Sequence, residues 1–203
     1  MIKIYGITPT RTARCLWMLE ELGLEYEQVE VSLKEGEHKK PDYLALNPNG
    51  RVPTLVDGDL TLWESMAINL YLADKYDGGL KLKTPEDRAR AVQWSFWGMT
   101  EMESKLMTVL RNRLLYDEDQ RDAALADEAE QELHTPLGVL NGALEGRDHL
   151  LDGAFSVADL NLAAITSWGK IGRVNMEPFP KVARWLSASL ARPAYRKVFP
   201  GRG

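Results

Sequence analysis

The sequence is poor in cysteine: among its 203 residues there is one, Cys15. A single thiol excludes an internal disulfide framework, a CxxC redox pair and a metal site built from several cysteines. Long apolar runs are missing as well, because no stretch approaches the roughly 20 residues of a membrane-spanning helix. The N-terminus, MIKIYG, lacks the apolar core of a signal peptide. We therefore expect a cytoplasmic protein without a bound metal.

Charge of one sign does not accumulate either. The chain carries 25 basic and 30 acidic residues, a net charge of -5, and no block of like charge. We therefore expect neither a nucleic acid nor a membrane surface as a partner. The hydrophobic content of 44% and charged content of 27% are those of an ordinary globular protein. The length allows two small domains, each with its own core.

The first part of the chain alternates between strand and helix patterns. Residues 2–5 alternate like a short strand, and an apolar stripe then predicts a helix that ends at Gly23. Alternation over residues 29–33 predicts a second strand, and so short a strand–helix–strand unit predicts a parallel pair. The Asp-Gly turn at residues 57–59 predicts a β-hairpin. A helix over residues 65–76 completes an α/β domain, residues 1–77.

After a linker, every strong signal is helical. Thr84 and Pro85 are a cap and a first-turn proline, and they predict a long helix from residue 86 to about residue 115. Further helices are predicted over residues 122–144, from Ser156, over residues 182–190 and from Pro193. Residues 86–203 are therefore expected to form an all-α domain.

Three segments together resemble the cytosolic glutathione S-transferase family. They are NPNGRVPTL at residues 47–55, DGDLTLWESMAI at residues 57–68 and LDGAFSVAD at residues 151–159. The ARPAY ending at residues 191–195 is similar too. The resemblance spans almost the whole chain in the family's order, with a first half like the bacterial theta and delta types. It implies a thioredoxin-like glutathione-binding domain at residues 1–77, followed by the helical domain.

The resemblance implies a glutathione site. Val52-Pro53 looks like the family's cis-proline, where the Val52 backbone pairs with the cysteinyl unit of glutathione. Ser65 is a favourable N-cap at a helix start, and by resemblance it holds the γ-glutamyl carboxylate while Glu64 assists. His38 and Lys39 match residues that approach the glycine end. The same task falls to Arg51, although a solvated charged loop is the alternative for all three.

The family activates the glutathione thiol with a hydroxyl or thiol just after the first strand. A gap-free comparison with delta-like enzymes falls on Pro9, which has no donor, so Thr10 and Thr8 are the alternatives and Thr10 is preferred. Arg11 adds positive potential. Lowering a thiol pKa by about 2 units takes about 2.7 kcal/mol, and one charge-assisted hydrogen bond supplies roughly 1.5–3 kcal/mol. One hydroxyl therefore suffices, unless these threonines only cap the helix.

Two other candidates are interpreted as structural. Tyr5 lies within the first strand, and Cys15 lies on the apolar side of the first helix, where a free cysteine is usually part of the core. The family's electrophile site lies against the long helix that begins near residue 86. Trp97, Met102 and Arg113 are the expected contributors there, with Trp168 as a possible addition.

The sequence therefore predicts an enzyme that transfers the glutathione thiolate to small hydrophobic electrophiles, with glutathione as co-substrate. Two alternatives stay open. One is glutathione-dependent reduction of peroxides or disulfides, which uses the same thiolate. The other is a binding or regulatory protein with little catalysis, which the missing serine, tyrosine or cysteine activator would explain. The resemblance also implies a homodimer.

Overall fold

The computed structural model describes residues 1–80, 82–151 and 153–200. Asp152, in the family-like segment at residues 151–159, and residues 201–203 lie outside the described residues. The chain divides into two compact units. The first comprises Met1–Leu82 and the segment that begins at Pro193, and the second comprises Lys83–Arg192.

The first unit contains a four-stranded sheet in the order β2-β1-β3-β4. Strand β1 (Ile2–Tyr5) pairs in parallel with β2 (Tyr26–Val29) and antiparallel with β3 (Thr54–Asp57). Strand β4 (Leu60–Trp63) closes a hairpin with β3 around Gly58, whose φ is +61°. The predicted first strand, parallel pair and Asp-Gly hairpin are confirmed, as is the thioredoxin-like α/β class.

The predicted position of the second strand is wrong. The strand covers Tyr26–Val29 instead of residues 29–33, and it lies at the edge of the sheet. Its two central residues are exposed, so its own sequence lacks a strong apolar alternation. Val31 is only 5% exposed, but it lies beyond the strand. The apolar alternation over residues 29–33 therefore reflects a side chain buried in the loop after the strand, and not the strand itself.

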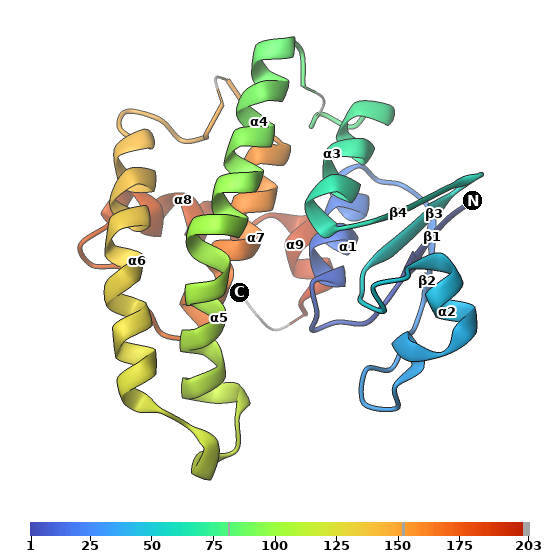
Figure 1. Ribbon diagram of the computed structural model, residues 1–203. Helices are drawn as coiled ribbons and strands as arrows, with labels where there is room; N and C mark the ends of the chain where they lie inside the picture. Colours follow the sequence, from blue (N-terminus) through green and yellow to red (C-terminus); the bar gives the residue numbers. More distant parts are fainter. Residues whose placement is uncertain (81, 152, 201–203) are drawn as a thin grey trace. The chain divides into compact units, whose positions relative to one another are not determined.

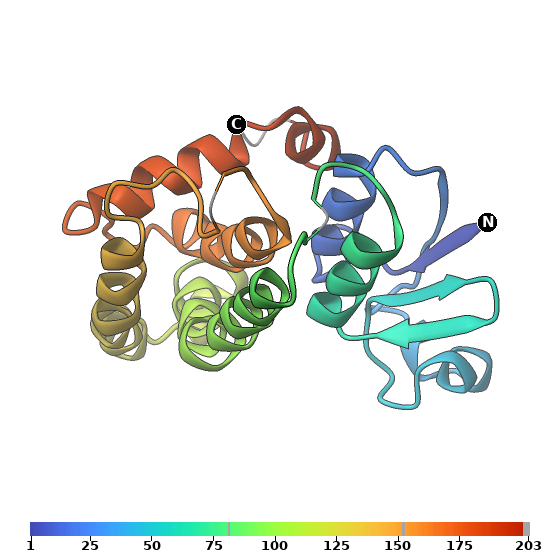
Figure 2. The ribbon, with the colours of Figure 1, turned by 90° about the horizontal axis from the view of Figure 1, so that it is seen from above.

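Helices cover both faces of this sheet. Figures 1 and 2 show α1 (Thr12–Glu21) and α3 (Ser65–Lys75) on one side and α2 (Pro41–Leu46) on the other. A 3₁₀ turn, Glu37–Lys39, precedes α2. Helix α1 ends as predicted just before Gly23, whose φ of +63° suits a residue without a side chain. The starts of α1 and α3 and the Val52-Pro53 peptide bond therefore all belong to the first unit.

The last helix belongs to this unit as well. In α9 (Pro193–Val198), the Tyr195 ring meets the edge of the buried Trp17 ring of α1 at 4.9 Å, and Lys197 forms an ion pair with Glu20 at 2.6 Å. The predicted helical domain, residues 86–203, included this segment. The structure differs there, because α9 buries its aromatic side chain on α1.

The described residues of the second unit form helices joined by loops, without a strand. Thr84 accepts a hydrogen bond from the Asp87 N–H and begins α4 (Pro85–Trp97). Helical structure then continues without a break through a π-helical segment (Gly98–Glu103), α5 (Ser104–Leu110) and a second π-helical segment (Arg111–Leu115). The predicted long helix from residue 86 to about residue 115 is confirmed.

The remaining helices also match their predictions. After a 3₁₀ turn (Glu118–Gln120), α6 (Ala123–Ala143) begins at the capping residue Asp122. Helix α7 (Val157–Ile171) contacts α4, α5 and α8 (Pro180–Leu190), and most of its side chains are buried. It is the central helix of this unit's core. Within the described ranges, no helix has the length and apolarity that crossing a membrane requires.

Candidate active site

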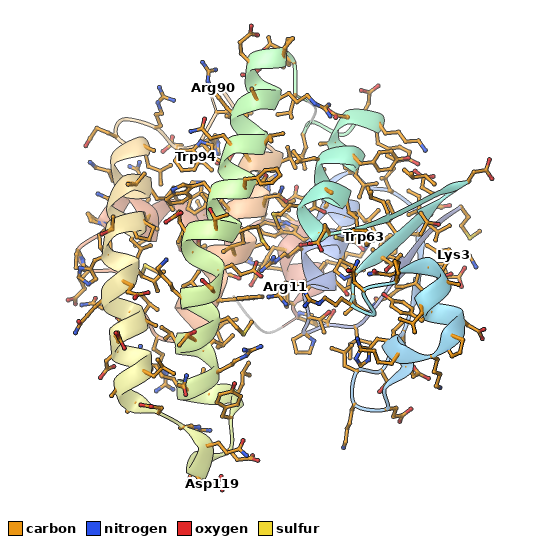
Figure 3. The ribbon with its side chains drawn as sticks, viewed as in Figure 1. Lys3, Arg11, Trp63, Arg90, Trp94 and Asp119 are labelled. Atoms are coloured by element: carbon orange, nitrogen blue, oxygen red, sulfur yellow. The ribbon has the colours of Figure 1, made fainter. Side chains whose placement is uncertain are left out.

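The segment between β1 and α1 holds three of the predicted residues. Thr8 is exposed and precedes Pro9 through a cis peptide bond, Thr10 is half-buried, and Arg11 is the exposed N-cap of α1. Figure 3 labels Arg11 at the start of this helix. Because α1 follows directly, its first N–H groups and its positive dipole end lie beside these side chains.

The Thr10 hydroxyl already has partners of its own. Its Oγ1 accepts a hydrogen bond from the Thr12 N–H at 3.1 Å, which caps the first turn of α1. It lies within donating distance of the Ile7 carbonyl at 2.5 Å and of Thr12 Oγ1 at 2.9 Å. A hydroxyl has one proton, so these two acceptors compete for it. The capping role is therefore present, and a thiolate would be a third acceptor.

Val52-Pro53 is a cis peptide bond, as the sequence predicted. Among the described residues, neither the N–H nor the C=O of Val52 has a hydrogen-bond partner, although Val52 is half-buried. A side chain on Gly6 would come within 3.0 Å of Val52 Cβ and would overlap Thr12 Oγ1. Gly6 thus lets Val52 and the start of α1 approach each other, and the Val52 backbone offers a donor and an acceptor beside the start of α1.

The start of α3 lies against α1. Ser65 is 3% exposed; its Oγ accepts a hydrogen bond from Arg14 Nη1 at 3.4 Å, and its carbonyl lies 3.7 Å from Cys15 Sγ. The expectation that Ser65 is the N-cap is wrong, because the N-cap is Glu64 and Ser65 is the first helical residue. Glu64 has a φ of +74°, which turns the chain sharply after β4. The first N–H groups of α3 lack intrahelical acceptors and favour an anion there.

The loop before α2 brings basic groups to the turn after it. Lys39 Nζ lies 3.4 Å from the Asn49 carbonyl, and a Cβ on Gly50 would lie 2.8 Å from both that Nζ and the His38 carbonyl. His38 Nδ1 is buried and has no hydrogen-bond partner among the described residues. The Arg51 side chain is exposed. His38 and Lys39 are therefore brought together beside the residues that lead to Val52.

Tyr5 and Cys15 have the structural settings that the sequence suggested. The Tyr5 ring meets the edge of Tyr43 at 6.3 Å within the unit. Cys15 is fully buried, and burial raises the pKa of its thiol far above the usual value, against the weaker opposing effect of the neighbouring Arg14 charge. A thiol that stays protonated is not a nucleophile at neutral pH.

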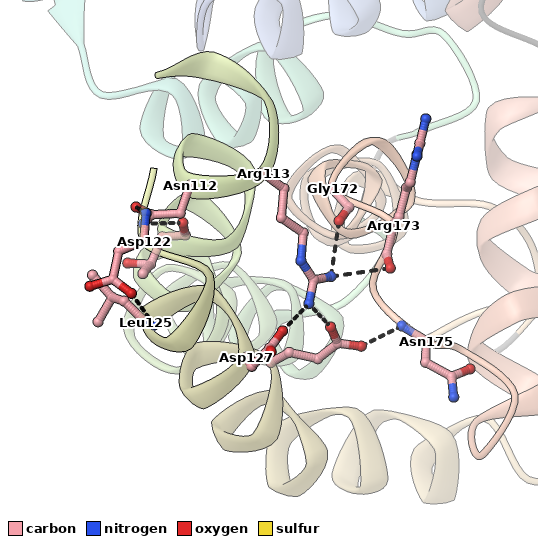
Figure 4. Close-up of polar contacts among 10 residues, drawn as sticks. Asn112, Arg113, Asp122, Leu125, Asp127, Gly172, Arg173 and Asn175 are labelled. Atoms are coloured by element: carbon pink, nitrogen blue, oxygen red, sulfur yellow. Dashed lines mark hydrogen bonds and ion pairs between the residues drawn. The ribbon is translucent and has the colours of Figure 1, made fainter. Parts of the chain in front are cut away.

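Two of the three expected electrophile-site residues are corrected by the structure. Met102 is 0% exposed and belongs to the core of the second unit, so no ligand reaches it without rearrangement. Arg113 forms ion pairs with Asp127 and Glu130 and donates to the Gly172 and Arg173 carbonyls, as Figure 4 shows. This arginine connects helices within the unit. Trp97 is half-buried near the end of α4, edge-on to Trp94 at 5.2 Å. Trp168 is half-buried in α7.

Sequence reasoning missed two residues that contact the candidate site. Arg14 reaches Ser65 across 51 positions of the chain, and Thr12 supplies both an N–H and a hydroxyl next to Thr10. The signal for Arg14 was an arginine inside an otherwise apolar stretch, residues 13–19. For Thr12 there was only the clustering of three threonines in five positions.

Comparison with known proteins gives a consistent result. Residues 1–74 match the family model described as glutathione S-transferase, N-terminal domain, and residues 98–193 match the C-terminal domain of the same family. Glutathione S-transferase 1 of Schizosaccharomyces pombe is 34% identical, over 98% of this chain and 93% of that protein. Glutathione S-transferase GstB of Escherichia coli is also 34% identical, over 98% and 97%.

A solved structure agrees in fold as well as in sequence. The theta class glutathione S-transferase from Xanthomonas axonopodis pv. citri, with glutathione bound, superposes with a TM-score of 0.88 at 32% identity. The match covers 97% of this chain and 95% of that one.

Proposed function

The chain belongs to the glutathione S-transferase family and is a transferase that uses the glutathione thiol, and from this premise we propose how its own residues bind and activate that thiol. The observation that carries the proposal is the Val52 backbone. Its N–H and C=O have no partner among the described residues, and Val52 and Thr12 both flank Gly6. An extended peptide that pairs with Val52 would lie beside the start of α1.

Glutathione is a tripeptide with a carboxylate at each end, and the first unit offers a partner for each part. We assign the cysteinyl unit to Val52, next to Pro53. The γ-glutamyl carboxylate is assigned to Ser65 and the N-terminus of α3, and its ammonium group to the Glu64 carboxylate. The glycine carboxylate is assigned to His38 and Lys39, with the exposed Arg51 able to add charge.

These assignments place the thiol at the start of α1, where Thr10 is the proposed donor to the thiolate and Thr8 the alternative. Thr10 is preferred because it is half-buried, and a hydrogen bond is stronger where water is partly excluded. Arg11, at the N-cap, adds positive potential. The thiol proton leaves to water. The thiolate then attacks an electrophilic carbon, forming a C–S bond as the bond to the leaving group breaks.

The test is a thiolate absorbance titration of bound glutathione in the wild type, Thr10→Ala and Thr10→Ser, with Thr8→Ala as the matched control. We expect the wild type and Thr10→Ser to lower the thiol pKa by about 2 units, and Thr10→Ala to return it most of the way to about 8.5. Thr8→Ala should behave as the wild type. If Thr8→Ala abolishes the shift instead, Thr8 is the activator; if neither variant changes it, a threonine donor is wrong.

For the electrophile, we propose the surface of α4 around Trp97. This half-buried aromatic residue, with the 67% exposed Phe96 beside it in sequence, is suited to small apolar molecules. Trp97→Ala is expected to raise KM for an apolar electrophile about tenfold while leaving the glutathione Kd unchanged. Met107→Ala, a half-buried residue of α5, is the control. Equal KM values in wild type and Trp97→Ala would remove Trp97 from the site.

A homodimer in the cytoplasm completes the proposal. Its support is the resemblance to the glutathione S-transferase family. Light scattering at micromolar concentration is expected to give twice the chain mass of 22.9 kDa. A mass of one chain under these conditions would contradict the dimer.

A further inference from the structure

Thr12 is the first residue of α1 and has no exposed surface. Its Oγ1 lies 2.9 Å from Thr10 Oγ1, and its backbone N–H donates to the same oxygen at 3.1 Å. Both polar groups of Thr12 that can donate therefore lie within reach of one atom. That atom is the hydroxyl oxygen proposed to face the glutathione thiolate.

The position of the Thr12 hydroxyl is tightly defined. Gly6 has a φ of +131°, and any side chain there would overlap Thr12 Oγ1. Gly6 is itself fixed by two hydrogen bonds, from its N–H to the Val29 carbonyl and from Gln28 Nε2 to its own carbonyl, each 2.9 Å long. The backbone just after β1 thus borders the space that holds this hydroxyl, and the Thr12 side chain is fully buried there.

The number of hydroxyl protons limits what Thr12 can contribute to Thr10 Oγ1. Without a ligand, the single Thr10 proton goes to the Ile7 carbonyl or to Thr12 Oγ1. When the Thr10 proton turns to a thiolate, Thr12 Oγ1 loses that donor. Reorientation of the Thr12 hydroxyl would then let its own proton point to Thr10 Oγ1 across the same 2.9 Å, the reverse of the Thr10-to-Thr12 hydrogen bond in the structure. Two donors from Thr12 then converge on Thr10 Oγ1, and hydrogen bonds accepted by a hydroxyl oxygen strengthen the one that it donates.

We propose that Thr12 is a positioning residue of thiol activation, whose buried hydroxyl and N–H orient Thr10 Oγ1 and strengthen its hydrogen bond to the thiolate. The inference rests on the proposed role of Thr10. Thr12 does not touch glutathione in this arrangement, so it acts through Thr10. Its contribution is expected to appear in the thiol acidity and in turnover, and not in the affinity for glutathione whose thiol is protonated.

The experiment compares Thr12→Ser with Thr12→Ala, a pair that differs by one oxygen. Thr12→Ser is expected to keep the thiol pKa of bound glutathione within about 0.2 units of the wild type. Thr12→Ala is expected to raise it by about half a unit to one unit, a fall of about three- to tenfold in the acid dissociation constant of the bound thiol. Calorimetry at about pH 5, where the bound thiol is protonated in every variant, should give the same glutathione Kd within twofold for both. A merely structural role would not move the thiol pKa while leaving the Kd unchanged.

A double mutant separates this inference from the proposed function. If Thr12 acts through Thr10, adding Thr12→Ala to Thr10→Ala changes the thiol pKa no further. If Thr10→Ala raises the pKa but Thr12→Ala does not, Thr10 is the activator and the inference about Thr12 is wrong. If Thr10→Ala has no effect, both the proposed activator and a role through it are wrong. Should Thr12→Ala fail to fold, Thr12→Val removes the same hydroxyl and keeps the branched shape.

Discussion

Cys15 and Thr10 both lie near the start of α1, but burial separates their chemistry. The Cys15 thiol is enclosed by the core, and burial raises its pKa, so the charged form that would react is disfavoured. Thr10 is half-buried and keeps a hydroxyl whose proton has alternative acceptors. The two side chains therefore differ in reactivity, because the core encloses the Cys15 thiol and leaves Thr10 only half-buried.

Cys15 is expected to be inert in the native protein. Because its pKa is raised, it remains a thiol through neutral and mildly alkaline pH, and its Sγ has no surface for a reagent to approach. An aromatic disulfide reagent should modify it at least about a hundredfold more slowly in the native protein than in urea. Rapid modification without denaturant, with loss of activity, would contradict its placement in the core.

Among the elements, α7 depends most clearly on one side chain. Asp159 is fully buried in its first turn. One carboxylate oxygen accepts from the Leu150 N–H and from Trp185 Nε1, and the other accepts from the N–H and hydroxyl of Ser156. Ser156 and Asp159 thus form a capping box, and the Asp159 carboxylate also joins the preceding loop and α8 to the helix.

Asp159→Asn is expected to destabilise the protein by about 3 kcal/mol. An amide has one oxygen, so one pair of buried donors would face an NH₂ group and lose its acceptor. Urea unfolding is the measurement, with Asp148→Asn as the matched control because the Asp148 side chain is 83% exposed. A difference between the two variants below about 0.5 kcal/mol would show that the carboxylate is replaceable.

At the scale of the whole molecule, the chain returns to its first unit at the end. Helix α9 follows α8 in sequence, yet it packs on α1 through Tyr195 and Trp17. Trp17 and Tyr195 are 0% and 4% exposed, respectively, so each removes the other from water. The first unit therefore includes residues from the first and the last described helices, and α1, which directly follows the proposed activating residues, packs against α9.

Tyr195→Ala should destabilise the first unit by about 3 kcal/mol, because it leaves a cavity against Trp17. Arg196→Ala, at the exposed neighbouring position, should change stability by less than about 0.5 kcal/mol. Urea unfolding followed by tryptophan fluorescence measures this effect. The glutathione Kd of Tyr195→Ala is measured across the same urea series. It should rise only at urea concentrations where the first unit of this variant unfolds. Equal midpoints for the two variants would mean that α9 does not support α1.

Local rules determined much of this protein from its sequence. Thr84 and Pro85 at the start of α4, Gly23 after α1 and the Asp-Gly turn of the hairpin each act on backbone atoms a few residues away. The family-like segments are also short, and their residues line up without knowledge of the fold. For that reason the class, the order of elements and the family could be predicted.

The tertiary structure decided what depends on partners distant in the sequence. Met102 is buried by other helices, and α9 packs on α1. Arg113 forms ion pairs with Asp127 and Glu130 and donates a hydrogen bond at the end of α7. The same holds for Ser65, which meets Arg14, and for Thr12, whose role depends on the backbone of Gly6. Periodicity shows that a side chain is apolar or charged, but only packing shows which atoms surround it, and those atoms set its burial, its acidity and its use.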